Sequence, residues 1–220
     1  MSLFKSQKHV FWQALVLTLI VFNFGIFLGF MLENSRVGKV NELYAESELS
    51  LLDVKIQSEI YSFVNINCDD AVKENIDFAN RIYEEAKILD RYETSSRLTE
   101  GIKLQHKKYD LLRTLLWLNS IKIKQKCNAS YYNLVYFYQY NAPSIEQKAK
   151  QTVFSRLLGE LKEKHGNNVL LIPFAADNNI SSVNVLLKTY NITTLPSVLI
   201  DEKTTAEGFL SREDIEKHLN

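Results

Sequence analysis

The segment from Val10 to Leu32 constrains this chain most, because none of its side chains is ionisable. Its 23 residues are enough for a helix to cross a hydrocarbon layer of about 30 Å. A cleavable signal peptide has a shorter apolar region, of about 7 to 15 residues, and a buried helix of a soluble protein normally has a polar stripe. We therefore expect residues 10–32 to be a single transmembrane helix in contact with lipid. Within it, Gly25 and Gly29 have the small-xxx-small spacing through which membrane helices can pair, which makes them a candidate oligomer contact.

The charges on either side of this segment predict its orientation. Lys5 and Lys8 precede it, whereas the first charged residue after it is Glu33. Because basic residues are retained on the cytoplasmic side, the pattern predicts a cytoplasmic tail over residues 1–9. The rest of the chain is then expected on the outer side of the cell membrane.

The composition argues against several classes of function. The 220 residues include 26 basic and 26 acidic side chains, so no net charge favours nucleic acid or another polyanion. The four histidines are scattered, and none has a metal-ligand spacing to a cysteine or an acidic residue. The sequence also lacks a glycine-rich phosphate loop and a serine-centred nucleophile elbow. We therefore expect no metal, no cofactor and no nucleic-acid partner.

Residues 33–126 are predicted to form a helical stalk or hairpin. Apolar residues recur at steps of three and four from Leu49 to Phe63, as an amphipathic helix requires. Two further stripes follow, separated by polar breaks at Asn65–Asp70 and Thr94–Ser96. Three antiparallel helices would fit this pattern, and so would one long first helix packed by a hairpin. The helices could also form a bundle that folds against the C-terminal domain.

The chain has two cysteines, one at each end of the predicted hairpin. Cys68 begins the second helix and Cys127 ends the third. Both then lie at the same end of the hairpin. Because the two predicted helices differ somewhat in length, a bend or early fraying near Lys124 is expected to bring the sulfurs together. Outside the membrane, an even number of cysteines favours a disulfide. We expect a structural staple; a redox-active pair and two inert free thiols are the alternatives.

After Cys127 the pattern changes to short strands that alternate with helices, which predicts an α/β domain over residues 127–220. The expected elements are strand Asn133–Gln139, helix Ile145–Lys164, strand Val169–Phe174, helix Ser181–Thr189, strands Ser197–Ile200 and Thr204–Phe209, and helix Ser211–His218. Right-handed crossovers would place the second strand at the sheet edge, beside the first. Pro173 agrees with an edge position, because proline is tolerated in a sheet essentially only at edges or bulges.

Two short motifs lie where this domain would carry its site. Ala142-Pro143-Ser144-Ile145 follows the first strand, and Thr194-Leu195-Pro196 precedes the third. The βαβαββα order and the second motif, interpreted as a cis-proline loop, resemble the thioredoxin fold. Together with the apolar helix and the helical hairpin, they make the chain similar to archaeal membrane-anchored thioredoxin-like proteins.

This resemblance implies a degenerate redox site. In relatives that carry Cys-Pro-x-Cys, the first cysteine corresponds to Ala142, the proline to Pro143 and the second cysteine to Ile145. Neither replacement can form a thiolate, so thiol–disulfide exchange is excluded at this turn. Ser144 is no substitute, because the sequence places no histidine or carboxylate to activate it. We therefore expect no catalytic residue here.

The resemblance also implies a function that needs no cysteine. In this fold the residue before the cis-proline offers backbone groups to an extended substrate, and here that residue is Leu195. We expect a membrane-tethered, redox-inactive module that binds an extended peptide or protein partner. Leu195 and the Ala142–Ile145 turn would then form an exposed apolar patch. The alternatives are an oxidoreductase or isomerase that uses Cys68 and Cys127, and a structural subunit of a membrane complex.

Three asparagines match the acceptor pattern for N-linked glycans if the domain lies outside the membrane. The matches are Asn128-Ala-Ser, Asn179-Ile-Ser and Asn191-Ile-Thr. The pattern is common by chance, so the sequence alone does not assign these sites.

Overall fold

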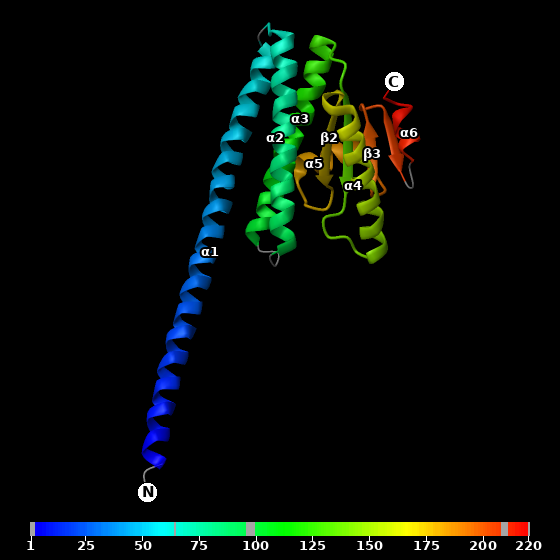
Figure 1. Cartoon of the computed structure of the whole chain (residues 1–220). Coiled ribbons are helices and arrows are strands. Elements are labelled where there is room, and N and C mark those ends of the chain that lie inside the picture. Colours follow the sequence, from blue (N-terminus) through cyan, green and yellow to red (C-terminus); the bar gives the residue numbers. More distant parts are fainter. Residues whose placement is uncertain (1–2, 64, 96–99, 208–210, 220) are drawn as a thin grey trace. The chain divides into compact units, whose positions relative to one another are not determined.

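The computed structural model describes residues 3–63, 65–95, 100–207 and 211–219. Three long helices come first, and a mixed four-stranded sheet with further helices follows (Figure 1). The chain forms two compact units, Met1–Glu46 and Ser47–Asn220, and the second contains the sheet. Parts of three expected segments lie outside the described residues: residues 1–2 of the tail, Ser96 of the second break, and residues 208–209 of the last strand.

Helix α1 (Leu3–Phe63) contains the apolar segment predicted to enter the membrane. From Val10 to Leu32 it is long and apolar enough to span a membrane, as the sequence predicts. All of its side chains over that range are exposed. Beside Gly25 and Gly29, no atom lies within 4 Å of the position that a Cβ would take, so the space next to both glycines is open.

The distal part of α1 packs with a helical hairpin made of α2 (Cys68–Ser95) and α3 (Glu100–Cys127). The arrangement is the long first helix with a hairpin, one of the two that the sequence allows. A disulfide joins Cys68 to Cys127, with 5.4 Å between the Cα atoms, as predicted. The predicted difference in helix length, and with it the early fraying near Lys124, is wrong. Since α2 and α3 both have 28 residues, the hairpin ends meet while α3 stays helical to its last residue.

After α3 the chain alternates strands and helices in the expected order. The elements are β1 (Tyr132–Tyr138), α4 (Ile145–His165), a 3-10 turn (Gly166–Asn168), β2 (Val169–Ala175), α5 (Ser181–Thr189), β3 (Ser197–Ile200), β4 (Thr204–Glu207) and α6 (Arg212–Glu216). The sheet order is β2-β1-β3-β4, with β1 and β2 parallel and the other two pairs antiparallel. Pro173 lies in the edge strand β2, opposite Tyr136, where its missing N–H is tolerated.

Both faces of the sheet are covered, and one core joins the helices to the sheet. On one face, side chains from α1, α2, α3 and α5 pack with those of β1, β2 and β3. Trp117 of α3 is fully buried there, with its ring 6.2 Å from that of Phe137 and 5.9 Å from that of Phe174. Residues of α4 and α6 form a second cluster with the sheet. The expected boundary between residues 126 and 127 therefore runs through a shared core, as in a bundle that folds against the C-terminal domain.

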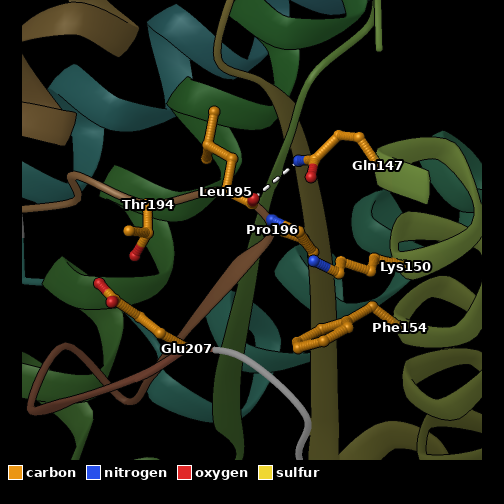
Figure 2. Close-up of a pocket in the computed structure, with 7 residues that line it drawn as sticks. All are labelled: Gln147, Lys150, Phe154, Thr194, Leu195, Pro196 and Glu207. Atoms are coloured by element: carbon orange, nitrogen blue, oxygen red, sulfur yellow. Dashed lines mark hydrogen bonds between the residues drawn. The ribbon is translucent and has the colours of Figure 1, made fainter. Parts of the chain in front are cut away.

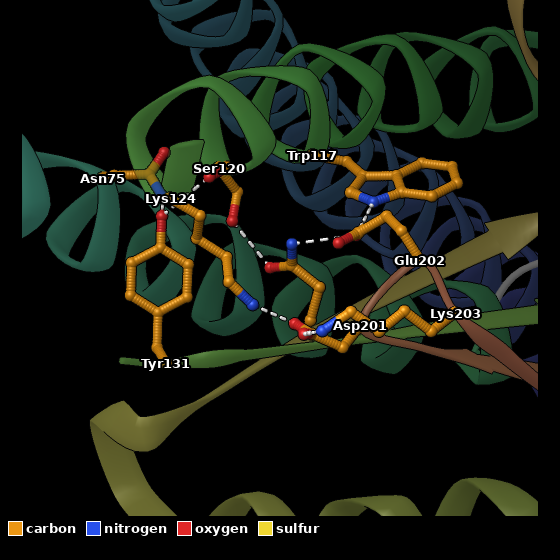
Figure 3. A network of polar contacts seen from close by, with 9 residues as sticks. Asn75, Trp117, Ser120, Lys124, Tyr131, Asp201, Glu202 and Lys203 are labelled. Atoms are coloured by element: carbon orange, nitrogen blue, oxygen red, sulfur yellow. Dashed lines mark hydrogen bonds and ion pairs between the residues drawn. The ribbon is translucent and has the colours of Figure 1, made fainter. Parts of the chain in front are cut away.

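A buried polar network fastens the turn between β3 and β4 to α3 (Figure 3). One carboxylate oxygen of Glu202 accepts hydrogen bonds from the Trp117 indole N–H and from Asn133 Nδ2, the latter at 2.9 Å. Next to it, Lys124 forms an ion pair with Asp201. Burial raises the pKa of Glu202 above its usual value, although its two hydrogen bonds oppose that shift. The helices and the sheet are therefore joined by polar bonds as well as by apolar packing.

Candidate functional site

The Ala142–Ile145 turn joins β1 to α4 and is shaped by local hydrogen bonds. Ser144 is the N-cap of α4, and its hydroxyl accepts a hydrogen bond from the Gln147 N–H at 3.1 Å. The carboxylate of Asp177, which follows β2, accepts from two consecutive backbone N–H groups just before the turn, at 2.7 and 2.9 Å. Ser144 therefore caps a helix, and Asp177 holds the turn in place.

The turn presents an apolar side chain to solvent. Ile145 is 90% exposed, the largest exposed fraction of any large hydrophobic side chain that the structure describes. Pro143 and Ser144 are also exposed, whereas Ala142 is half-buried. The apolar surface of this turn therefore comes mainly from Ile145 and Pro143.

The Thr194–Pro196 loop lies beside α4. Its Leu195–Pro196 peptide bond is cis. The Leu195 carbonyl accepts a hydrogen bond from Gln147 Nε2 at 2.7 Å, which ties the loop to α4 (Figure 2). The Leu195 side chain is half-buried and packs against the core that contains Trp117. Of the expected apolar patch, Ile145 is thus exposed, whereas Leu195 packs inward. Burial of its side chain in the core removes apolar surface from water, which is favourable.

A pocket of about 370 Å³ opens beside Pro196 (Figure 2). It is lined by Gln147, Lys150 and Phe154 of α4, by Thr194, Leu195 and Pro196 of the loop, and by Glu207 at the end of β4. Phe154 and Pro196 are buried and give the pocket an apolar wall. Lys150 and Glu207 bring a positive and a negative charge to it from two different elements.

Sequence reasoning found the loop but missed the other walls of this pocket. Gln147, Lys150 and Phe154 recur at steps of three and four, so they share one face of α4. That spacing is visible in the sequence, but nothing in it identifies the loop as the opposite surface. Glu207 reaches the pocket because β4 pairs with β3, in a register that places Glu207 opposite Ser197.

Lys150 also has a partner on its own helix. Its ammonium lies 2.8 Å from a carboxylate oxygen of Glu146, one turn earlier. The hydrogen bond from Lys150 and its charge hold the pKa of Glu146 below its usual value. Both side chains reach solvent, which screens the pair. The Lys150 ammonium can therefore change partners when an anionic group enters the pocket.

A larger hollow of about 560 Å³ lies beside the disulfide. It is lined by Cys68 and Cys127, by one face of α2, and by the residues that lead from α3 into β1. These are the only two cysteines of the chain and both are oxidised, so neither offers a thiol to the pocket beside Pro196. Among the described residues, no group of three or more histidine, cysteine or acidic side chains could hold a metal ion.

The comparisons with known proteins assign no family. No family model matches the chain, and no curated protein matches it. Among solved structures, the chain is similar to one described as "Structure of a malarial protein", with 18% sequence identity and a TM-score of 0.32. The similarity covers 40% of this chain and 93% of that chain. At that TM-score it carries no argument about fold or function.

Proposed function

We propose that this chain is a membrane-tethered, redox-silent module with a thioredoxin-like domain, like the archaeal membrane-anchored proteins that its sequence resembles. Its pocket beside Pro196 binds an extended peptide or protein partner. The βαβαββα element order and the β2-β1-β3-β4 sheet support the thioredoxin-like arrangement. The residues of the turn support a role without thiol chemistry, because Ala142 and Ile145 cannot form a thiolate.

Helix α1 supplies the tether in this proposal. The apolar side chains of residues 10–32 would be buried among lipid chains. Lys5 and Lys8 before the segment favour a cytoplasmic N-terminus. The unit Ser47–Asn220 would then lie on the outer side of the cell membrane. The Cys68–Cys127 disulfide supports that location, since disulfides persist in oxidising compartments.

The pocket beside Pro196 is the observation that carries the proposal. Its volume of about 370 Å³ lies near the lower end of the range of ligand pockets, roughly 300–1,000 Å³. It therefore suits one or two side chains of a peptide better than a large cofactor. Phe154 and Pro196 would receive an apolar side chain, and Lys150 and Glu207 would pair with polar groups on either side of it.

The loop also offers a backbone donor. In the part of the chain that the structure describes, the Leu195 N–H donates no hydrogen bond. The Leu195 carbonyl accepts from Gln147, which uses one of its two lone pairs. The carbonyl of an extended peptide would accept from the Leu195 N–H, and main-chain hydrogen bonds of this kind give affinity with little dependence on sequence. The pocket would then supply the selectivity.

The test compares two exposed threonines. Thr194 lines the pocket, and Thr205, on β4, does not. Peptides are selected from a random display library against the full chain in detergent micelles, and their affinities are measured by fluorescence anisotropy. Thr194→Lys, which places a long charged side chain at the pocket, should weaken binding at least about tenfold, or about 1.4 kcal/mol. Thr205→Lys should stay within about twofold of the wild type. Equal effects of the two changes, or a library that yields no binder, would contradict the proposal.

A second candidate function is thiol–disulfide exchange through Cys68 and Cys127. It is favoured by one observation: both cysteines are only half-buried and line the same hollow. Cys68 is also the first residue of α2, where a helix N-terminus stabilises a thiolate. Insulin reduction by the wild type and by Cys68→Ser tests this candidate function. If the substitution leaves the activity unchanged, the candidate is excluded. If the chain is instead a structural subunit, crosslinking in membranes should yield one defined complex.

A further inference from the structure

The three asparagines of the Asn-x-Ser/Thr matches share one local backbone conformation. Asn128, Asn179 and Asn191 have φ angles of 50°, 53° and 52°. Each lies in a connecting segment next to a helix: Asn128 directly follows α3, Asn179 comes just before α5, and Asn191 comes just after it. All three are exposed. The left-handed region is sparsely used by residues other than glycine, although asparagine tolerates it well.

The two residues that follow each asparagine also repeat one pattern. The middle residues are partly buried and pack against the core that contains Trp117; they are Ala129, Ile180 and Ile192. The hydroxyl residues are exposed; they are Ser130, Ser181 and Thr193. Each tripeptide thus turns its middle side chain inward and its first and third side chains toward solvent. A glycan on the first side chain could then extend into solvent without displacing the middle side chain from the core.

The preference of asparagine for the left-handed backbone conformation explains only the first residue of each Asn-x-Ser/Thr match. In the described part of the chain, none of the three hydroxyl groups makes a hydrogen bond, and Ser181 is not the N-cap of α5. Local structure therefore does not explain why the third residue of all three matches carries a hydroxyl group. Asparagines with structural roles behave differently, since Asn75, Asn119 and Asn133 are buried and donate hydrogen bonds, and none is followed by x-Ser/Thr.

We propose that Asn128, Asn179 and Asn191 are acceptor sites for N-linked glycans, an inference that rests on the outer-side location in the proposed function. A glycan is bulky and soluble, so its acceptor must have no inward contact to lose. None of the three asparagines lines the pocket beside Pro196. Asn128 lines the hollow beside the disulfide instead. Glycans on all three sites would therefore leave the pocket lining itself unmodified.

The transfer takes an oligosaccharide that is linked through phosphate to an isoprenoid lipid, and a membrane transferase. The asparagine Nδ2 forms a bond to C1 of the first sugar while the bond between C1 and the phosphate oxygen breaks. The lipid phosphate leaves with the electron pair, and the amide gives up one proton to a base of the transferase. No oxidant or reductant takes part. The product keeps an amide N–H and gains a neutral or charged glycan at an exposed loop position.

The experiment expresses the full chain in eukaryotic cells and treats it with a glycosidase that removes N-linked glycans. Gel mobility and intact mass are expected to shift in three steps. Asn128→Gln, Asn179→Gln and Asn191→Gln should each remove one step, and the triple variant should lose all three. Substitution of the third residue by alanine, as in Thr193→Ala, should remove the same step as its asparagine.

Two added tags, each containing an Asn-x-Ser/Thr acceptor, test the membrane orientation separately from the glycan sites that depend on it. One tag is fused before residue 1 and the other after residue 220 of the same chain. Modification of the C-terminal tag together with three internal steps supports the inference. Modification of the C-terminal tag without internal steps overturns the inference and leaves the outer-side location intact. Modification of the N-terminal tag alone overturns the outer-side location and the glycan sites together.

Discussion

Replacing Glu202 with alanine should loosen the attachment of the β3–β4 turn to α3. The substitution removes the acceptor of two buried donors, the Trp117 indole N–H and the Asn133 amide. An orphaned buried donor costs about 1–3 kcal/mol, so the two together cost roughly 2–6 kcal/mol. Removing a carboxylate whose ionisation is disfavoured by burial offsets part of that cost. We therefore expect Glu202→Ala to lower the free energy of unfolding by about 2–4 kcal/mol.

Glu202→Gln separates the hydrogen bonds from the charge. The amide oxygen of glutamine can accept from both Trp117 and Asn133, so the variant should stay within about 1 kcal/mol of the wild type at pH 7. The pKa of Glu202 is raised from its usual 4.5, so the folded state binds this proton more tightly than the unfolded state. The contribution of this group to stability is therefore largest below about pH 4.5 and declines as the pH rises through the folded-state pKa. Glu202→Gln should remove that decline.

Urea unfolding of the full chain in detergent micelles measures both effects. The chain has two tryptophans, so a Trp12→Phe background leaves Trp117 as the only reporter. With a slope near 2 kcal/mol per M, Glu202→Ala should lower the midpoint by about 1–2 M. Glu59→Ala, at an exposed position on α1, should change stability by no more than about 0.5 kcal/mol. Equal midpoints for Glu202→Ala and Glu59→Ala would refute the reasoning, and so would a loss in Glu202→Gln as large as that in Glu202→Ala.

Three further predictions concern the disulfide, the shared core and the cap of α6. Replacing both Cys68 and Cys127 with serine opens a loop whose ends lie 59 residues apart and should lower the free energy of unfolding by about 4 kcal/mol; a change below about 1 kcal/mol in urea unfolding would contradict it. Leu116→Ala, in the core between α3 and the sheet, should cost about 2–5 kcal/mol, whereas Leu104→Ala, at a 51% exposed position, should cost far less in the same assay. Hydrogen bonds from Ser211 lower the pKa of Asp214 from 3.8 to about 2, so this group stabilises the fold above about pH 3.8 and the effect is lost as the pH falls through about 2. Carboxyl NMR titration should show the Asp214 pKa rising in Ser211→Ala, and an unchanged value would rule out the cap as its cause.

The elements of this chain follow from local sequence, because periodicity and turn residues are local signals. Helix α5 begins and ends where the sequence predicts, and the handedness of the crossovers together with Pro173 indicates the edge strand. The disulfide could be predicted because both cysteines lie at helix ends. The unequal helix lengths and the fraying near Lys124 were wrongly predicted, because helix ends are the part of an element that a sequence pattern locates least well.

The contacts that join these elements could not be predicted in the same way. An apolar stripe indicates a buried face but does not identify the surface that covers it, so the shared core around Trp117 was only one of several alternatives. The hydrogen bond from Trp117 to Glu202 joins residues 85 positions apart, and the one from Gln147 to Leu195 joins residues 48 positions apart. Such pairs depend on strand register and helix packing. The pocket therefore emerges only when the α4 face, the loop and the end of β4 are placed together.

The most direct measurement of the central claim is hydrogen exchange at the Leu195 amide, with and without a peptide selected against the full chain. If the peptide lies extended in the pocket beside Pro196, its carbonyl accepts from the Leu195 N–H, and exchange at that amide should slow at least about tenfold at saturation. The amides around the disulfide hollow should be unaffected. A peptide that binds while exchange at Leu195 stays unchanged would contradict the account.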